Sequence, residues 1–122
     1  MSDTKFLRQI SETLQYMLAA KYTERYQSIV RKLPKSVFEG DENVTEEVHA
    51  LLHSYIDLCA EEVMLHKQGQ VPDAIWNTWR EGIIAGNTLP AVMAVWKSSI
   101  TSVHYNELSG FLTKNNVQIK EA

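Results

Sequence analysis

The chain has 122 residues, of which 44% are hydrophobic and 22% charged, with a formal net charge of −3. This size and composition predict a single globular domain with a hydrophobic core and exclude a largely disordered chain. The single cysteine, Cys59, excludes an intramolecular disulfide and favours a reducing compartment. Because we find no signal-like segment and no run of about 18 apolar residues, we expect a cytoplasmic protein without a membrane-spanning helix.

The charges are unevenly spread along the sequence. Residues 1–35 hold seven Lys and Arg against three Asp and Glu, whereas residues 36–81 hold two against ten. Such an asymmetry can orient a partner or a second copy of the chain. It is more typical of two helices whose solvent faces simply differ in charge, and both interpretations stay open.

The first predicted element is a long helix. Residues 4–33 contain neither Gly nor Pro, and apolar side chains recur there at steps of three and four. Pro34 ends the pattern. The segment forms either one continuous helix or two helices that break near Lys21. A continuous helix of this length carries more apolar surface than one small bundle can cover, so the excess is expected to pair with another chain.

The second long helix follows a loop predicted over residues 35–43. Asn43 or Thr45 can cap its start, and the helical pattern runs to about Lys67. Gly69 then supplies a typical stop signal.

Three shorter helices are expected after this stop. The first opens at 71–73, the second has Thr88 as its cap with Pro90 in the first turn, and the third runs from about Ser102 to Lys114. No segment alternates with the period of a strand. The sequence therefore predicts an all-α bundle of two long antiparallel helices and two or three shorter C-terminal helices, with residues 1–114 as one domain and 115–122 as a flexible tail.

The second long helix carries a candidate metal site. His49 and His53 are four residues apart, so both rings can reach one ion, and Asp57 or Glu46 could add an oxygen ligand. Ala50 stands where a zincin has its catalytic glutamate, which argues against a metalloprotease. The alternative is an ordinary polar face with two solvated histidines. On the apolar side, Glu62 and His66 are also four apart, and they form either an acid–base pair or two groups that reach solvent near the helix end.

Aromatic and basic side chains supply candidate binding residues. Exposed tryptophans mark binding surfaces, but burial in the core is their usual place. The basic stretch from Lys21 to Lys35 has tyrosines interleaved, which is a modest nucleic-acid signal that the acidic overall balance opposes. The candidates are Trp76, Trp79, Arg80, Tyr22, Arg25 and Tyr26.

Part of the chain shows a resemblance in the order of its motifs. The relevant motifs are Ser54-Tyr55-Ile56-Asp57, then Gly69, Val71-Pro72-Asp73 and Trp76, followed by Pro90, Trp96, Tyr105 and Leu108 to Leu112. Over residues 45–114 this order resembles bacterial all-helical families of unknown function. Ser54 and Asp57 depart from the Asn and Glu usual there. The resemblance implies an all-α fold and brings no activity and no catalytic residues.

The sequence favours a non-enzymatic helical protein that binds another protein or itself. It contains no glycine-rich phosphate loop, no Gly-x-Ser-x-Gly motif and no Cys-x-x-Cys motif, so we expect neither a catalytic site nor a cofactor. Two alternatives stay open. One is a metal-dependent hydrolase centred on His49 and His53, and the other is a nucleic-acid-associated regulator that uses the basic first helix.

Overall fold

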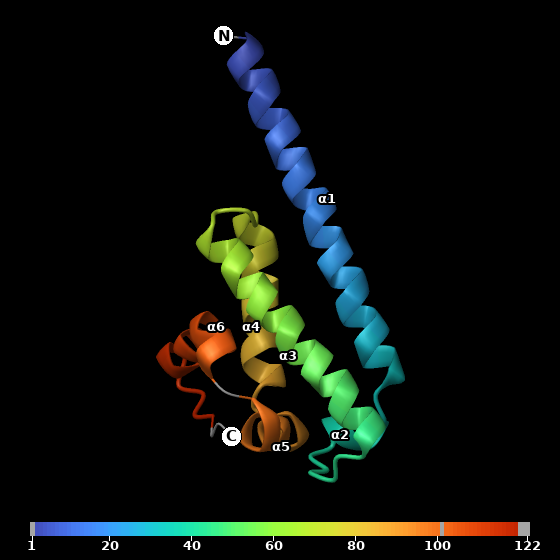
Figure 1. Cartoon of the computed structure of the whole chain (residues 1–122). Helices are drawn as coiled ribbons and strands as arrows, with labels where there is room; N and C mark the ends of the chain where they lie inside the picture. Colours follow the sequence, from blue (N-terminus) through green and yellow to red (C-terminus); the bar gives the residue numbers. More distant parts are fainter. Residues whose placement is uncertain (1, 101, 120–122) are drawn as a thin grey trace.

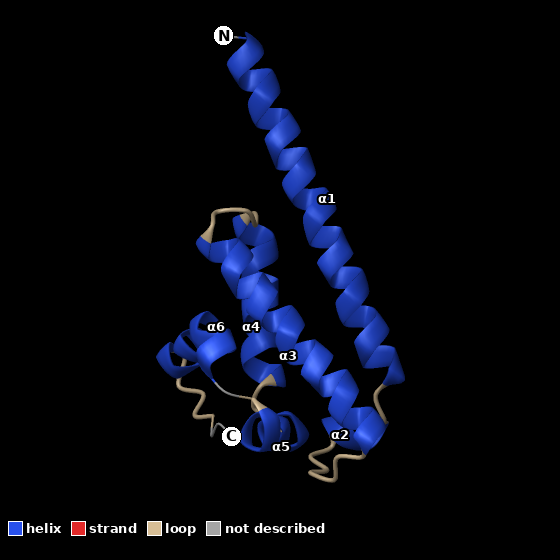
Figure 2. Cartoon of the chain, viewed as in Figure 1, coloured by secondary structure: helices blue, strands red, loops and turns tan. Residues whose placement is uncertain are grey.

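The computed structural model describes residues 2–100 and 102–119, which form six helices and no strand (Figures 1 and 2). The predicted all-α class is confirmed. The helices are α1 (Ser2–Lys32), α2 (Lys35–Phe38), α3 (Glu46–Lys67), α4 (Asp73–Gly86), α5 (Pro90–Ser99) and α6 (Ser102–Lys114).

Helix α1 is continuous through Lys21, so of the two sequence alternatives the unbroken helix is the one observed. Pro34 ends it, as predicted, because its ring excludes the preceding residue from the helical conformation. The same proline occupies the N-cap of α2 with an extended backbone. The loop predicted over residues 35–43 was therefore wrong in part, since its first four residues form one helical turn that buries Val37.

Helix α3 lies at the centre of the fold and packs against α1, α4, α5 and α6. It begins as predicted at Thr45, whose Oγ1 accepts a hydrogen bond from the Val48 backbone amide at 3.2 Å. It ends at Lys67, and Gly69 follows with a φ of 71°, the left-handed conformation that glycine adopts without strain. The two long helices α1 and α3 run side by side in opposite directions (Figure 1).

The C-terminal helices close the other side of α3. Helix α5 begins at Pro90, and Leu89 occupies its N-cap. The prediction that Thr88 caps this helix was wrong, because the Thr88 hydroxyl donates to the Ala85 carbonyl oxygen of the preceding helix. Beyond α6, Val117 is buried in the core and its amide donates to the Leu112 carbonyl oxygen at 2.9 Å. Residues 120–122 of the predicted tail lie outside the described residues.

A buried polar pair sits within the core between α4 and α5. Asn87 is fully buried, and its Oδ1 accepts a hydrogen bond from Trp96 Nε1 at 2.9 Å. Its Nδ2 donates to the Ile83 carbonyl oxygen at 2.8 Å and lies 3.7 Å from Cys59 Sγ. Every side-chain polar atom of this amide therefore has a partner, which is what a buried amide requires.

Gly86 permits the close approach of α4 to α3. A Cβ atom at this position would overlap the Tyr55 ring, with the ring Cζ only 2.7 Å away. The Tyr55 hydroxyl donates to the Gly82 carbonyl oxygen at 3.1 Å, which holds the ring in place. Any side chain at Gly86 must therefore push the two helices apart.

We expect Gly86→Ala to lower the free energy of unfolding by about 1–3 kcal/mol, the usual cost of overpacking a core. Urea unfolding followed by circular dichroism measures this. Adding Tyr55→Leu removes the obstructing ring, so the double variant should lose less stability than the two single losses added together. Strict additivity would contradict the proposed overlap.

In the part of the chain that the structure describes, no helix combines the length and the apolar character needed to cross a membrane.

Candidate functional site

Helix α1 presents two different apolar faces. Ala19, Tyr22 and Ile29 face the bundle and pack against its core. In the N-terminal half, Leu7, Ile10, Leu14 and Met17 form a second stripe, with Phe6 at its edge. At 3.6 residues per turn this stripe points about 120° away from the first face. It therefore does not continue the surface that α3 covers.

This second stripe is exposed because its half of α1 extends beyond the other helices (Figure 1). All residues from Asp3 to Leu14 are exposed. Phe6, Leu7, Leu14 and Met17 each leave between 58% and 64% of their surface exposed, and Ile10 leaves 40%. Isolated exposed leucines are common, but a contiguous stripe of large apolar side chains typically marks an interaction surface. We call these five residues the α1 stripe.

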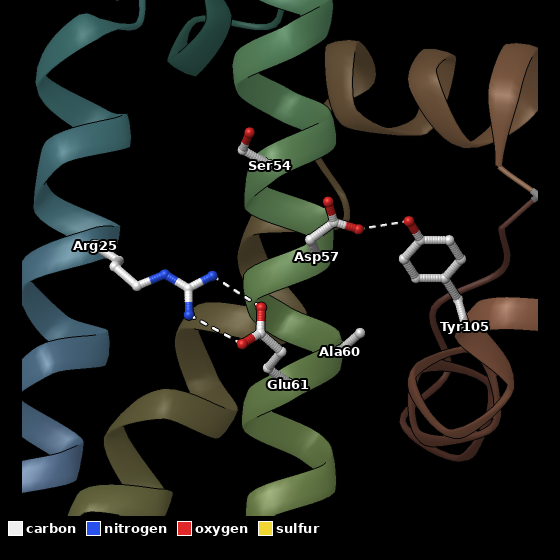
Figure 3. A pocket seen from close by; sticks show the side chains of 6 residues that line it. All are labelled: Arg25, Ser54, Asp57, Ala60, Glu61 and Tyr105. Atoms are coloured by element: carbon white, nitrogen blue, oxygen red, sulfur yellow. Dashed lines mark hydrogen bonds and ion pairs between the residues drawn. The ribbon is translucent and has the colours of Figure 1, made fainter.

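A polar cleft of about 450 Å³ lies over α3, between α1 and α6 (Figure 3). On one side, Arg25 of α1 forms two hydrogen bonds to the Glu61 carboxylate, at 3.0 and 2.8 Å. On the other, the Tyr105 hydroxyl of α6 donates to Asp57 Oδ1. Each carboxylate of the cleft is therefore engaged by a neighbouring helix.

Contacts within the protein shift the pKa values of the side chains that line this cleft. Hydrogen bonding to Arg25 lowers the pKa of Glu61, and the same bond raises the pKa of Arg25. Burial and the nearby Asp57 carboxylate raise the pKa of Tyr105 to about 12. None of these shifts moves a group into the neutral range where general acid–base catalysis operates. The cleft residues therefore attach α1 and α6 to α3.

The structure does not bring the three predicted metal ligands together. His53 Nδ1 lies 3.4 Å from Asp57 Oδ2, but the His49 ring faces Ser99 instead, with 2.9 Å between Nε2 and Oγ. Within residues 2–100 and 102–119, no group of three or more His, Cys, Asp and Glu side chains is placed to hold a metal ion. A zinc site needs at least three such protein ligands.

The candidate residues of α4 lie mainly inside the fold. Trp76 is buried and stacks on the His66 ring, with centroids 3.9 Å apart and the planes nearly parallel. Trp79 is also buried and contacts the Tyr22 ring of α1. Arg80 is exposed and its guanidinium donates to Asn115 Oδ1 after α6. The tryptophans thus contribute to packing between helices.

The candidate residues of α1 form part of its contact with α3. The Tyr22 hydroxyl donates to Glu61 Oε1 at 3.2 Å, and the Arg25 guanidinium lies 5.0 Å from the Tyr22 ring centre. Tyr26 is exposed on one side and tilts toward the Tyr55 ring on the other. Tyr22 and Arg25 thus both engage Glu61 and help to attach α1 to α3.

A second pocket, of about 330 Å³, lies between α1, α3 and α4 and contains Glu62 in its wall. Glu62 is only 6% exposed, and burial raises its pKa to about 8. It does not pair with His66, which stacks on Trp76 instead. The sequence singled out Glu62 because it lies on the apolar side of α3. The pocket itself could not be predicted from this helix alone, because residues of three helices line it.

Fold and surface together define a small all-α protein whose first helix projects beyond the others. No protein-family model matches the sequence, and the comparisons with curated proteins and with solved structures likewise found no match.

Proposed function

We propose that this protein is a helical interaction module that associates with a second copy of itself through the α1 stripe. The observation that carries the proposal is the exposure of five large apolar side chains on a half-helix that extends beyond the rest of the fold. Two such stripes packed together would remove both from water, and burial of apolar surface is the main driving force of association.

The charge balance of the N-terminal half of α1 favours a second copy of the chain over nucleic acid or an anionic membrane as its partner. Residues 2–17 carry Lys5 and Arg8 against Asp3 and Glu12, so their charges cancel. Helices that bind phosphate backbones or acidic lipid surfaces carry an excess of basic side chains instead. The positions that flank the stripe are mostly uncharged, so two copies can approach without repulsion.

The order of residues along the stripe supports an antiparallel pairing. Leu7, Ile10, Leu14 and Met17 follow the alternating three- and four-residue steps of a coiled-coil seam, and the same steps continue to Asp3 at one end and Lys21 at the other. Both end residues are exposed. In an antiparallel pair, Asp3 of each copy meets Lys21 of the other, whereas a parallel pair places like charges together.

Light scattering coupled to size-exclusion chromatography tests self-association. A chain of 13.9 kDa should elute with twice that mass at about 100 µM and dissociate on dilution, because a short two-helix seam is expected to bind in the micromolar range. A strictly monomeric mass at several hundred micromolar would contradict the proposal.

Charge reversal tests the orientation. We expect Asp3→Lys and Lys21→Asp each to weaken the dimer about tenfold, because each creates two like-charge contacts in an antiparallel pair. Mixing the two variants should restore association, since every end contact then joins opposite charges. In a parallel pair neither single variant would weaken the dimer, because both ends of the unaltered pair already join like charges, and the mixture would associate more tightly than the unaltered chain.

A further inference from the structure

The pocket that contains Glu62 has the walls of a small-molecule site. Each of the three surrounding helices supplies an aromatic ring: Tyr26 from α1, Tyr55 from α3 and Trp79 from α4. Ile75 and Ile83 of α4 complete a mainly apolar lining. Its volume of about 330 Å³ falls within the range of ligand-binding pockets in proteins. The pocket involves neither the α1 stripe nor the proposed dimer seam.

Among the residues that the structure describes, Glu62 is the only carboxylate in this lining. More than nine-tenths of its surface is buried, and among the described residues its carboxyl group accepts and donates no hydrogen bond. Arg25, whose charge partly lowers the pKa of Glu62, is held by both oxygens of Glu61. A buried carboxylate without a countercharge is costly, so Glu62 is expected to stay protonated until a cation reaches it.

We propose that this pocket binds a small organic cation with an apolar body, such as a primary arylalkylamine, whose ammonium group pairs with Glu62. The ammonium supplies the charge that Glu62 lacks and three hydrogen-bond donors. The aromatic walls favour a cation over an anion because the faces of their rings are electronegative. The apolar body of the ligand would replace water along Ile75 and Ile83.

This pairing makes ligand affinity depend on pH. Glu62 has a pKa of about 8 in the unliganded protein, so it must lose a proton to pair with an ammonium. Affinity should therefore rise with pH through this value. Burial raises the pKa of Cys59 to about 12, and that of Tyr55 still further, so neither titrates in the same range. The charged and titratable groups that face Glu62 or line the pocket are Arg25 and Tyr26 of α1 and Tyr55, Cys59 and Glu61 of α3, whereas α4 lines the pocket with none.

Titration of the full chain with 4-phenylbutylamine, followed by NMR at the Trp79 indole, tests this proposal. We expect the amine to bind at least tenfold more tightly at pH 9 than at pH 6.5 and to bind more tightly than 4-phenylbutanol at pH 9. Glu62→Gln should remove the pH dependence and the preference for the amine. Asp57→Asn, a matched change on the same helix in the other cleft, should leave both unchanged.

A second variant keeps Glu62 and blocks its pocket. Thr78 lines the pocket from an exposed position on α4, so Thr78→Phe should abolish amine binding while the fold is retained. Equal affinity for the amine and the alcohol, unaltered binding to the Glu62→Gln variant, or no shift of the Trp79 indole at millimolar amine would overturn the proposal. Because the readout is local, these outcomes are independent of whether the protein dimerises.

Discussion

Replacing Leu7 and Leu14 with glutamine is expected to convert the proposed dimer into a monomer. Both side chains lie in the α1 stripe and are more than half exposed in the single chain. A symmetric dimer would lose four leucine contacts, at roughly 1 kcal/mol each for side chains at a partly covered seam. The resulting loss of about 4 kcal/mol corresponds to nearly a thousandfold increase in the dissociation constant. Sedimentation velocity over a range of concentrations measures this change.

The fold of the monomer should be unaffected by this double change. Glutamine has nearly the same helix propensity as leucine, and neither position packs against the bundle. A matched control is Lys5→Gln with Glu12→Gln, which lies on roughly the opposite side of α1 and leaves the net charge unchanged. It should dimerise like the unaltered chain. An equal loss of association in the control would show that the stripe is not the contact surface.

Local signals in the sequence were enough to place most helix ends. Thr45, Pro34 and Gly69 each act on the backbone within a few residues, through a side-chain cap, a fixed φ or tolerance of a positive φ. The short helix after Pro34 was missed because a single turn has no periodicity to detect. The residue type of Thr88 predicts a helix cap, but its hydroxyl donates to the Ala85 carbonyl oxygen of the preceding helix.

The candidate site was predictable only where it depended on one helix. The excess of apolar surface on α1 follows from spacing alone, so interaction through this helix could be expected from the sequence. The partners of Asp57 and Glu61 could not be predicted from the sequence, because Tyr105 and Arg25 lie 48 and 36 residues away in the chain. The sequence indicated that this polar face of α3 is solvated. In the structure, α1 flanks it on one side and α6 on the other.

Asn87 shows how non-local packing changes the meaning of a residue. After Gly86 it is typical of a helix end, and α4 does end there. Its burial depends on Trp96 of α5 and Cys59 of α3, which local patterns do not reveal. The structure therefore gives this polar residue a role in fixing the core, since a buried amide requires all of its partners to be in place.

Asn87→Ala is expected to lower the free energy of unfolding by about 3 kcal/mol. The change leaves the buried indole N–H of Trp96 without its acceptor and creates a cavity beside Cys59, and each effect costs on the order of 1–2 kcal/mol. Urea unfolding monitored by tryptophan fluorescence measures the loss. The exposed Asn77 of α4 is a control of the same residue type, and Asn77→Ala should change stability by less than about 0.5 kcal/mol.

A double-mutant cycle separates the hydrogen bond from the loss of packing. Trp96→Phe removes the donor and part of a fully buried ring, which leaves Asn87 Oδ1 without a partner. In the double variant Asn87→Ala with Trp96→Phe, neither half of the bond remains unsatisfied. Its destabilisation should therefore fall short of the sum of the two single losses by about 1–2 kcal/mol. A sum that is simply additive would mean that the two side chains stabilise the core independently and that the buried bond contributes little.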